Sequence, residues 1–422
     1  MVEPSRFFPR TGTANSADLT RRRVVLSAAA GAFGAVVLTA CSSSEQPSGG
    51  ASPASPRTPS PSEPPFTPTI SVEPARDAVE VNPVAPVVVS TEQGRFAEVQ
   101  LLGPEGTVAG SLSEDGRRWE ATAPRRFDTQ YQLKMAVVDP GNSSRRVEDS
   151  FTFTTTSPAM QADATFNIVD GQTYGTGQII QIRFSEPVLN RGEVEKALTV
   201  SGAGNQPGKV RWYSDHMMRY RPEDKWAPNS AVQVSLQLRG VNLGNGMIGN
   251  QNYDLRFLTG NKHYAVVDNR DKIMRTFIND QPGPEYYVTL GNEEWPSVIG
   301  QLVIIEQHQK YKFDPRSIGL TRGDPHWYDP FYAHNTSRLT FGGVFVHQAL
   351  PSAMPVLGKA NVSHGCIGMP PEGARFIYET FRPGDVIETL NTGYLQADPD
   401  DGYGDWNIPF EHYDNSSWKG NW

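Results

Sequence analysis

The stretch that decides the fold of this chain runs from Gly342 to Met369 and reads GGVFVHQALPSAMPVLGKANVSHGCIGM. Its first part, Gly343–Val346, is a short apolar run that is typical of a buried strand, and His347 follows directly. After a segment broken by two prolines and a glycine, the chain returns as Ser-His-Gly-Cys at residues 363–366. We expect the strand end and the returning loop to face each other, which brings a thiol and an imidazole together.

This pairing predicts nucleophilic chemistry at Cys366. A free thiol has a pKa of about 8.5 and is mostly protonated at neutral pH, whereas its thiolate is the strong nucleophile. A histidine within reach supplies the base that removes the proton, and His347 is the candidate. The alternative interpretation is a buried, inert cysteine that lies near two unrelated histidines, His347 and His364.

The pattern resembles the catalytic signature of the L,D-transpeptidases, the cysteine enzymes that cross-link peptidoglycan. That family has a histidine, a spacer of similar length, Ser/Thr-His-Gly-Cys, an apolar residue and commonly Asn or Arg. His347, residues 363–366 and Ile367 match this signature, with fifteen residues between His347 and Ser363. Gly368 departs from it, because the family usually has a polar side chain there.

The resemblance implies a peptidoglycan-modifying acyltransferase that needs no cofactor. Cys366 attacks the diaminopimelate carbonyl of a tetrapeptide stem, releases the terminal D-alanine and forms a thioester. The side-chain amine of a second diaminopimelate then gives a 3→3 cross-link, while water gives carboxypeptidation, and the sequence leaves the balance open. We expect an oxyanion hole from the backbone N–H groups of His364, Gly365 and Cys366. We also expect His347 to be oriented by a carbonyl near Gly342–Gly343 or by an unidentified group.

Candidate substrate contacts lie on both sides of the cysteine motif. The aromatic segment from Asp324 to Thr340 corresponds to a flap over the active site in the family, with a tyrosine near the nucleophile. Tyr328 is the first match for that tyrosine and Tyr332 the next; simple surface packing is the alternative. Ser363 and Gly368 are further candidates, and carbapenem β-lactams are expected to acylate the cysteine. The loop from Trp295 to Gln301, which borders the site in relatives, departs from their pattern.

The N-terminal region predicts export and membrane anchoring. Residues 1–41 combine three consecutive arginines at 21–23, a short apolar run and a Leu-Thr-Ala-Cys ending that resembles a lipobox. Lipidation of Cys41 would anchor the mature protein on the outer face of the cytoplasmic membrane, facing the cell wall; an ordinary signal with an incidental cysteine is the alternative. Residues 42–70 are a Ser/Pro-rich linker. Cys366 is then the one cysteine left of two, which favours a thiol kept for its reactivity.

The remaining sequence predicts a mainly β protein. Short alternating runs with frequent turn residues indicate two tandem immunoglobulin-like β-sandwiches, at residues 71–160 and 161–260. A β-rich L,D-transpeptidase catalytic domain is expected at 261–391, with strands at 265–267, 286–291, 301–305 and 386–390 and one helix near 371–381. The sandwiches are interpreted as a spacer that packs on the catalytic domain, and wall binding is the alternative.

The C-terminal extension, residues 392–422, carries three tryptophans and several other aromatic residues. Burying such side chains contributes a few kcal/mol each, so we expect the extension to pack on the catalytic domain or the second sandwich. A glycan-binding platform is the alternative.

The composition and the spacing of residues disfavour some classes of partner. The net charge is −8, so phosphate attraction does not favour a nucleic-acid partner. His326 and His334 lack further Cys or His residues at metal-binding spacing, so no metal site is predicted. Two other function classes stay open: a non-enzymatic lipoprotein that binds wall or a partner through its sandwiches, and a sortase-like or peptidase enzyme, whose expected arrangement of Cys, His and Arg is not found.

Overall fold

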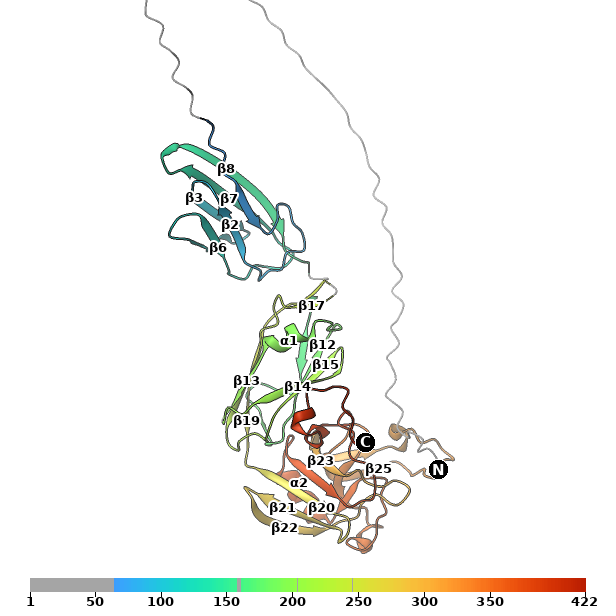
Figure 1. Cartoon of the computed structure of the whole chain (residues 1–422). Coiled ribbons are helices and arrows are strands. Elements are labelled where there is room, and N and C mark those ends of the chain that lie inside the picture. The colour runs from blue at the N-terminus through green and yellow to red at the C-terminus, as the bar shows by residue number, and fades with distance from the viewer. Residues whose placement is uncertain (1–63, 158–160, 203, 245) are drawn as a thin grey trace, which may run out of the picture. The chain divides into compact units, whose positions relative to one another are not determined.

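The computed structural model describes residues 64–157, 161–202, 204–244 and 246–422. The predicted signal segment, the lipidation site at Cys41 and most of the predicted linker lie outside these residues. The described chain is mainly β, as predicted, with two α-helices (Figure 1). No helix within the described ranges is long and apolar enough to cross a membrane.

The first sandwich consists of two four-stranded sheets. One sheet has the order β1 (Ile70–Glu73), β2 (Val87–Thr91), β6 (Arg118–Ala121) and β5 (Ser111–Leu112). The other has the order β4 (Gly106–Val108), β3 (Arg95–Gly103), β7 (Gln130–Asp139) and β8 (Asn142–Thr154). Alternate residues of both sheets are buried, which is the pattern expected when one face of each sheet lines the core.

The second sandwich repeats this plan. Its sheets are β10 (Ala164–Phe166), β12 (Ile180–Phe184), β15 (Met217–Pro222), β14 (Gly208–Ser214), and β11 (Thr173–Tyr174), β19 (Tyr253–Thr259), β16 (Ala231–Leu236), β13 (Leu198–Gly202). Helix α1 (Arg191–Ala197) and a small sheet of β17 (Asn242–Gly244), β18 (Met247–Gly249) and β9 (Gln161–Ala162) complete it. Both main sheets contribute to one core, in which Ile182 and Met218 meet Val234 and Phe257. The predicted domain limits remain predictions.

Two further sheets build the C-terminal unit. The first has the order β22 (Gln281–Tyr287), β21 (Ile273–Ile278), β20 (His263–Asp268), β28 (Val386–Leu390) and β23 (Gly300–Val303). The second has the order β24 (Glu306–Phe313), β25 (Phe331–Arg338), β26 (Phe345–Gln348) and β27 (Ile367–Met369). Helix α2 (Pro371–Thr380) buries Ala374 and Ile377 in the shared core, which confirms the predicted helix and its apolar face.

The strand predicted at 301–305 ends at Val303. Two other predicted strands differ from the observed ones for local reasons. The run expected at Gly343–Val346 forms a strand two residues later, because Gly343 has a φ of 107° and belongs to a turn. The run expected at 286–291 leaves its strand after Tyr287. Its next residues make isolated bridges to the cysteine motif, Thr289 to Gly368 and Gly291 to Ser363.

The aromatic C-terminal extension packs between the second sandwich and the two sheets of the C-terminal unit, as predicted. The Trp406 indole N–H donates to the Gly177 carbonyl of the sandwich at 2.8 Å. On the other side, the Gln301 N–H donates to the Asn407 side chain at 2.7 Å. The extension contains the short 3-10 turns η4 (Gly404–Asn407) and η5 (Phe410–His412).

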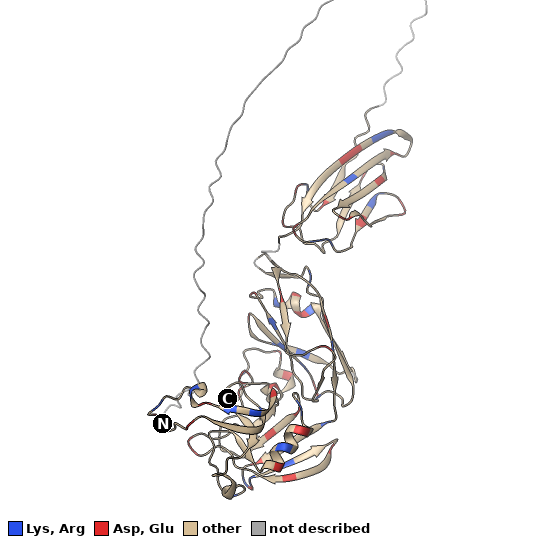
Figure 2. Cartoon of the chain, turned by 180° about the vertical axis from the view of Figure 1, so that it is seen from behind, with Lys and Arg blue, Asp and Glu red and all other residues tan. Residues whose placement is uncertain are grey.

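A fully buried ion pair fixes the extension to the sandwich. Arg219 of β15 and Asp405 of η4 are 3.0 Å apart, and both side chains are 0% exposed. The Asp405 carboxylate also accepts hydrogen bonds from the hydroxyls of Tyr213 and Tyr413, each at 2.7 Å. Elsewhere basic and acidic residues are interspersed along the strands, as Figure 2 shows, and many form exposed pairs such as Arg146 with Glu148.

Candidate active site

Strand pairing places the two predicted catalytic residues, His347 and Cys366, on one face of the second sheet of the C-terminal unit. Strands β26 and β27 are parallel, with Val346 across from Ile367 and His347 across from Gly368. Because side chains alternate along a strand, Cys366 lies on the same face as Gly368 and therefore on the face of His347. Gly368 lies directly across from His347 and has no side chain. The imidazole and the thiol are therefore diagonal neighbours on adjacent strands.

The opposite face of these strands belongs to the main core. Val346, Ile367 and Met369 are all 0% exposed and pack in the cluster that α2 covers. The Cys366 side of the sheet instead faces an aromatic layer that includes Phe313 and Phe345. The burial of every second residue thus fixes the register, since a slip by one residue would put Cys366 into the core.

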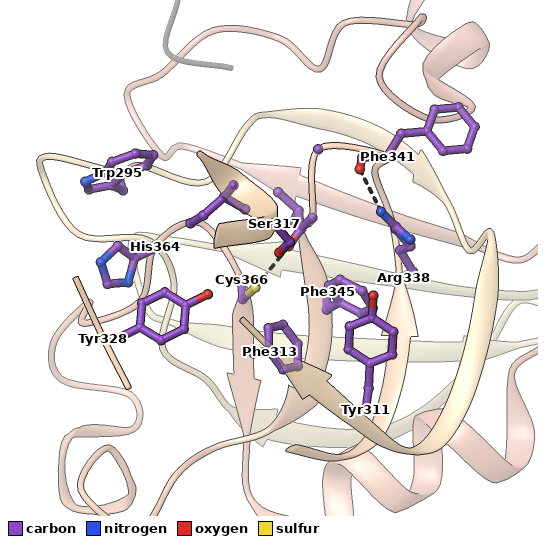
Figure 3. Close-up of a pocket in the computed structure, with 14 residues that line it drawn as sticks. Trp295, Tyr311, Phe313, Ser317, Tyr328, Arg338, Phe341, Phe345, His364 and Cys366 are labelled. Atoms are coloured by element: carbon purple, nitrogen blue, oxygen red, sulfur yellow. Dashed lines mark hydrogen bonds between the residues drawn. The ribbon is translucent and has the colours of Figure 1, made fainter. Parts of the chain in front are cut away.

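The thiol is held in a defined resting position. The Cys366 Sγ donates a hydrogen bond to the Gly343 carbonyl at 3.6 Å, drawn as a dashed line in Figure 3. Cys366 is 9% exposed, and burial raises the pKa of its thiol to about 11, although a hydrogen bond from the Phe345 backbone opposes this shift. In its resting position the Cys366 side chain is therefore a neutral thiol.

His347 is held by a different carbonyl from the one predicted. Its Nδ1 lies 2.8 Å from the Gln348 carbonyl, so Nδ1 carries the proton and Nε2 is free to accept one. The expected carbonyl at Gly342–Gly343 binds the thiol instead, because the turn before β26 faces Cys366 rather than the end of the strand. Burial lowers the pKa of His347, although the Gln348 hydrogen bond opposes this effect, and the ring packs against Phe313 at 5.2 Å.

A cavity of about 90 Å³ opens at Cys366. In Figure 3, Tyr328 and His364 lie on one side of the thiol, and Phe345 and Arg338 lie on the other. Strands β24, β25 and β26, the loops before β23, β25 and β26, and the cysteine motif all contribute to its lining. The lining residues are Trp295, Tyr311, Phe313, Ser317, Ile318, Tyr328, Arg338, Phe341, Gly342, Gly343, Val344, Phe345, His364 and Cys366.

Of the two tyrosines predicted over the site, Tyr328 lines the cavity and Tyr332 does not. Tyr328 packs against the His364 ring at 5.4 Å, and burial, with the nearby Cys366, raises the pKa of its hydroxyl to about 12. Tyr332 is 55% exposed, and its ring faces the Lys310 ammonium at 4.5 Å. Tyr332 lies outside the cavity lining because it belongs to β25, where alternation turns it away from the inward-facing Phe331 and Ala333, so its substrate contact stays a prediction.

The predicted lid is shorter than the aromatic segment that suggested it. Residues Phe331–Arg338 form β25, which pairs with β24, so the irregular part over the cavity ends before Phe331. The ring of His326 in this part lies 5.6 Å from Trp295, and its Nδ1 lies 3.4 Å from the Glu294 carboxylate. The loop around Trp295 therefore borders the site, as predicted.

The other motif residues shape the loop. The Ser363 hydroxyl donates to the Cys366 carbonyl at 2.6 Å and accepts from the Gly365 N–H at 3.2 Å, so it closes the turn and is absent from the cavity lining. Gly365 has a φ of 106°, a backbone conformation that favours glycine. Its N–H is occupied, which leaves the backbone N–H groups of His364 and Cys366 as the predicted oxyanion donors.

Gly368 is buried for a steric reason. A Cβ at this position would lie 2.9 Å from the Thr289 Cγ2. The polar side chain usual in the family therefore has no room unless Thr289 moves, so the substrate contact predicted at Gly368 is replaced by close backbone packing.

Sequence reasoning missed Ser297 as a supporting residue. Its hydroxyl donates to the Gly365 carbonyl at 2.7 Å and accepts from the Gly291 N–H at 3.0 Å, and the residue is 2% exposed. Ser297 thus fixes the cysteine loop from behind. A serine in a loop carries no sequence signal for this role, because the contact joins residues far apart in the chain.

Comparison with known proteins yields two family matches. Residues 262–389 match the model of the L,D-transpeptidase catalytic domain, and residues 78–242 match that of a bacterial Ig domain. The catalytic-domain match contains both His347 and Cys366.

Individual relatives match over most of the chain. L,D-transpeptidase 2 of Mycobacterium tuberculosis (strain CDC 1551 / Oshkosh) is 31% identical over 351 residues, which are 82% of this chain and 84% of that protein. L,D-transpeptidase 5 of Mycobacterium tuberculosis (strain ATCC 25618 / H37Rv) is 26% identical over 82% of this chain and 76% of its own length. The solved structure of the LD transpeptidase LdtMt1 in complex with imipenem covers 55% of this chain and 100% of its own, at 26% identity and a TM-score of 0.48.

Proposed function

The chain belongs to the L,D-transpeptidase family, and we propose that it makes 3→3 cross-links between peptidoglycan stems through a thioester on Cys366. The family membership itself makes the protein a transpeptidase of peptidoglycan. The observation that supports the finer proposal is the parallel register that puts Cys366 and His347 on one face of adjacent strands.

The neutral Cys366 thiol and the neutral His347 imidazole suit an attack in which His347 acts as the base. His347 is uncharged at neutral pH because burial lowers its pKa, so its free Nε2 accepts a proton. For attack, the thiol turns from the Gly343 carbonyl toward that nitrogen. Proton transfer then generates the thiolate only when a substrate carbonyl is present to receive it, which protects the buried thiol between turnovers.

Acylation transfers the stem peptide to the Cys366 sulfur and releases the terminal D-alanine. The Cys366 sulfur forms a bond to the diaminopimelate carbonyl carbon, and the oxygen takes up negative charge that the backbone N–H groups of His364 and Cys366 stabilise. The tetrahedral intermediate collapses, the bond to the terminal D-alanine breaks, and His347 returns its proton to the departing amine. A thioester and free D-alanine result.

Deacylation runs in the reverse sense with a new amine. The side-chain amine of a second diaminopimelate attacks the thioester while His347 removes its proton, and the Cys366 sulfur leaves and is reprotonated. The aromatic lining and the lid around Tyr328 limit the access of water, which favours the amine as acceptor over hydrolysis.

The same thioester chemistry makes the site a target for β-lactams. The carbonyl of a carbapenem ring is an activated acyl group, and one relative has been solved in complex with imipenem. We propose that carbapenems acylate Cys366.

We further propose that the protein is exported and anchored by lipid on Cys41, facing the cell wall. The Leu-Thr-Ala-Cys sequence and the preceding apolar run support this placement. Mass spectrometry of the N-terminal peptide of protein purified from membranes tests it: a diacylglyceryl group on Cys41 supports the proposal, whereas an unmodified Cys41 that is retained in the mature chain contradicts it.

The cross-linking activity is tested with purified protein and a disaccharide-tetrapeptide. Mass spectrometry should detect a dimer that has lost one D-alanine, and fragmentation should place the new bond between two diaminopimelate residues. Cys366→Ala should form no dimer, and the exposed Tyr332→Phe serves as the matched control. A tripeptide product without dimer would make the enzyme a carboxypeptidase, and unchanged substrate would contradict the proposal.

A further inference from the structure

The C-terminal extension reaches the turn that holds the catalytic thiol. The carboxylate of Asp401 accepts a hydrogen bond from the Gly342 N–H, across 59 residues of sequence. The next residue, Gly343, supplies the carbonyl to which the Cys366 thiol donates. Gly342, Gly343 and Cys366 all line the cavity, whereas Asp401 lies behind its wall.

This turn needs support because it contains two successive glycines. Glycine restricts the backbone least, and Gly343 has a φ of 107°. Inside the turn, the Gly343 N–H donates to the Thr340 carbonyl at 3.3 Å and the Val344 N–H donates to the Thr340 hydroxyl at 3.2 Å. The Leu339 N–H also donates to the Val344 carbonyl at 2.8 Å and closes the base of the turn. None of these bonds involves the Gly342 N–H, so the contact from Asp401 adds a restraint that the turn does not supply itself.

The structure fits Asp401 closely against this turn. A Cβ added to Gly342 would lie 2.8 Å from an Asp401 carboxylate oxygen, so a larger residue at 342 would displace the carboxylate. Gly402, with a φ of 122°, lets the extension pass within contact of the Leu339 carbonyl. The ring of Tyr403 then meets Phe341 of the cavity wall edge-on at 5.7 Å.

Asp401 is itself fixed from the sandwich side. Four residues later, Asp405 forms the buried ion pair with Arg219 of the second sandwich. The extension therefore connects the buried ion pair to the turn beside the thiol. Because the segment from Asp401 to Asp405 is short, the ion pair restricts the positions that Asp401 can take.

We propose that Asp401 is a positioning residue for Cys366: its carboxylate holds the Gly342–Gly343 turn so that the Gly343 carbonyl meets the thiol. This role rests on the proposed function of Cys366 as nucleophile. Asp401 contacts neither the substrate nor the sulfur and acts through the turn alone.

The test compares Asp401→Ala and Asp401→Asn with a matched control, Asp400→Ala, whose side chain is exposed in the same loop. Iodoacetamide alkylation of Cys366 as a function of pH reports the thiol pKa. Since the Gly343 carbonyl stabilises the neutral thiol, Asp401→Ala should lower the alkylation pKa by about half a unit. Cross-linking kcat should fall about tenfold with little change in KM, because a misplaced nucleophile slows the chemical step.

The asparagine variant separates this role from a structural one. Its amide oxygen accepts the same bond from Gly342, so it should restore both the alkylation pKa and kcat toward wild type. If Asp401→Ala matches Asp400→Ala in both readouts, the proposal is wrong.

A measurement on the wild-type full chain keeps the test decisive if the alanine variant does not fold. The Gly342 amide should exchange with solvent deuterium at least about tenfold more slowly than an unprotected peptide; exchange at the unprotected rate would overturn the proposal. A wild-type enzyme without cross-linking activity would instead refute the proposed function, and the alkylation and exchange results would still report on Asp401.

Discussion

Replacing Asp405 with alanine removes the buried partner of Arg219 and should strongly destabilise the unit formed by the second sandwich, the extension and the catalytic sheets. Both side chains of the pair are 0% exposed, so solvent cannot replace the lost carboxylate. Burial is the largest single effect and disfavours a charged guanidinium, but Asp405 together with the nearby tyrosine hydroxyls outweighs it and raises the pKa of Arg219. The variant therefore leaves a cation buried without its counter-charge.

The magnitude follows from the contacts that are lost. Removing one partner of a buried ion pair costs about 3–5 kcal/mol, because the other charge stays buried and unpaired. The hydroxyls of Tyr213 and Tyr413 lose their acceptor as well. Arg219 keeps its bonds to the Pro399 carbonyl and the Gln181 side chain, which limits the loss. We expect about 4 kcal/mol, or a decrease in melting temperature of roughly 10 °C for a unit of this size.

Calorimetry of the wild type, Asp405→Ala, Arg219→Met and the double variant measures this cost. The double variant should be more stable than the sum of the two single changes predicts, because it no longer buries an unpaired charge. Glu193→Ala serves as the control, since it breaks an exposed pair with Lys196 and should cost less than about 0.5 kcal/mol. A loss below about 1 kcal/mol for Asp405→Ala, or additive single changes, would refute the reasoning.

Three further predictions concern the site. Because burial lowers the pKa of His347, the rate of acylation by a carbapenem should stay constant down to about pH 6.5, the ordinary pKa of histidine. The rate should fall only at more acidic pH, as the imidazole takes up a proton. A stopped-flow pH profile that already falls above pH 6.5 would contradict this. Gly368→Asn should lower cross-linking at least about tenfold, since its Cβ meets Thr289 at 2.9 Å, and the added change Thr289→Ser should recover part of the rate; full activity of the single variant would show that the strand has room. Ser297→Ala should cost about 1–3 kcal/mol in chemical denaturation, because the buried Gly365 carbonyl and Gly291 N–H both lose their partner, and an unchanged midpoint would argue against that support.

The site residues that could be predicted from the sequence are those whose chemistry leaves a local pattern. The spacing from His347 to the Ser-His-Gly-Cys motif predicted that strand and loop come together, and β26 and β27 are indeed adjacent. The helix that begins at Pro371 could be predicted because three signals indicate it: a proline at its first position, an acidic residue in its first turn and apolar residues at helical spacing. Tyr328 came instead from the family resemblance, which implies a tyrosine near the nucleophile in this aromatic segment.

The missed features depend on contacts between distant segments. The carbonyl that holds His347 belongs to Gln348 and not to the glycine turn, and only the direction of that turn decides between them. Tyr332 was assigned to a lid because a run of aromatic residues does not show where the loop ends and strand alternation begins. The bond from Asp401 to Gly342 joins residues that no spacing rule connects.

Intact-mass spectrometry of the purified protein after exposure to imipenem tests most directly whether Cys366 is the nucleophile that His347 activates. The account predicts one covalent adduct per chain, located on the peptide that contains Cys366, formed at least about a hundredfold more slowly by His347→Gln and not formed by Cys366→Ala. An adduct that persists in Cys366→Ala, or a His347→Gln variant that reacts at the wild-type rate, would contradict it.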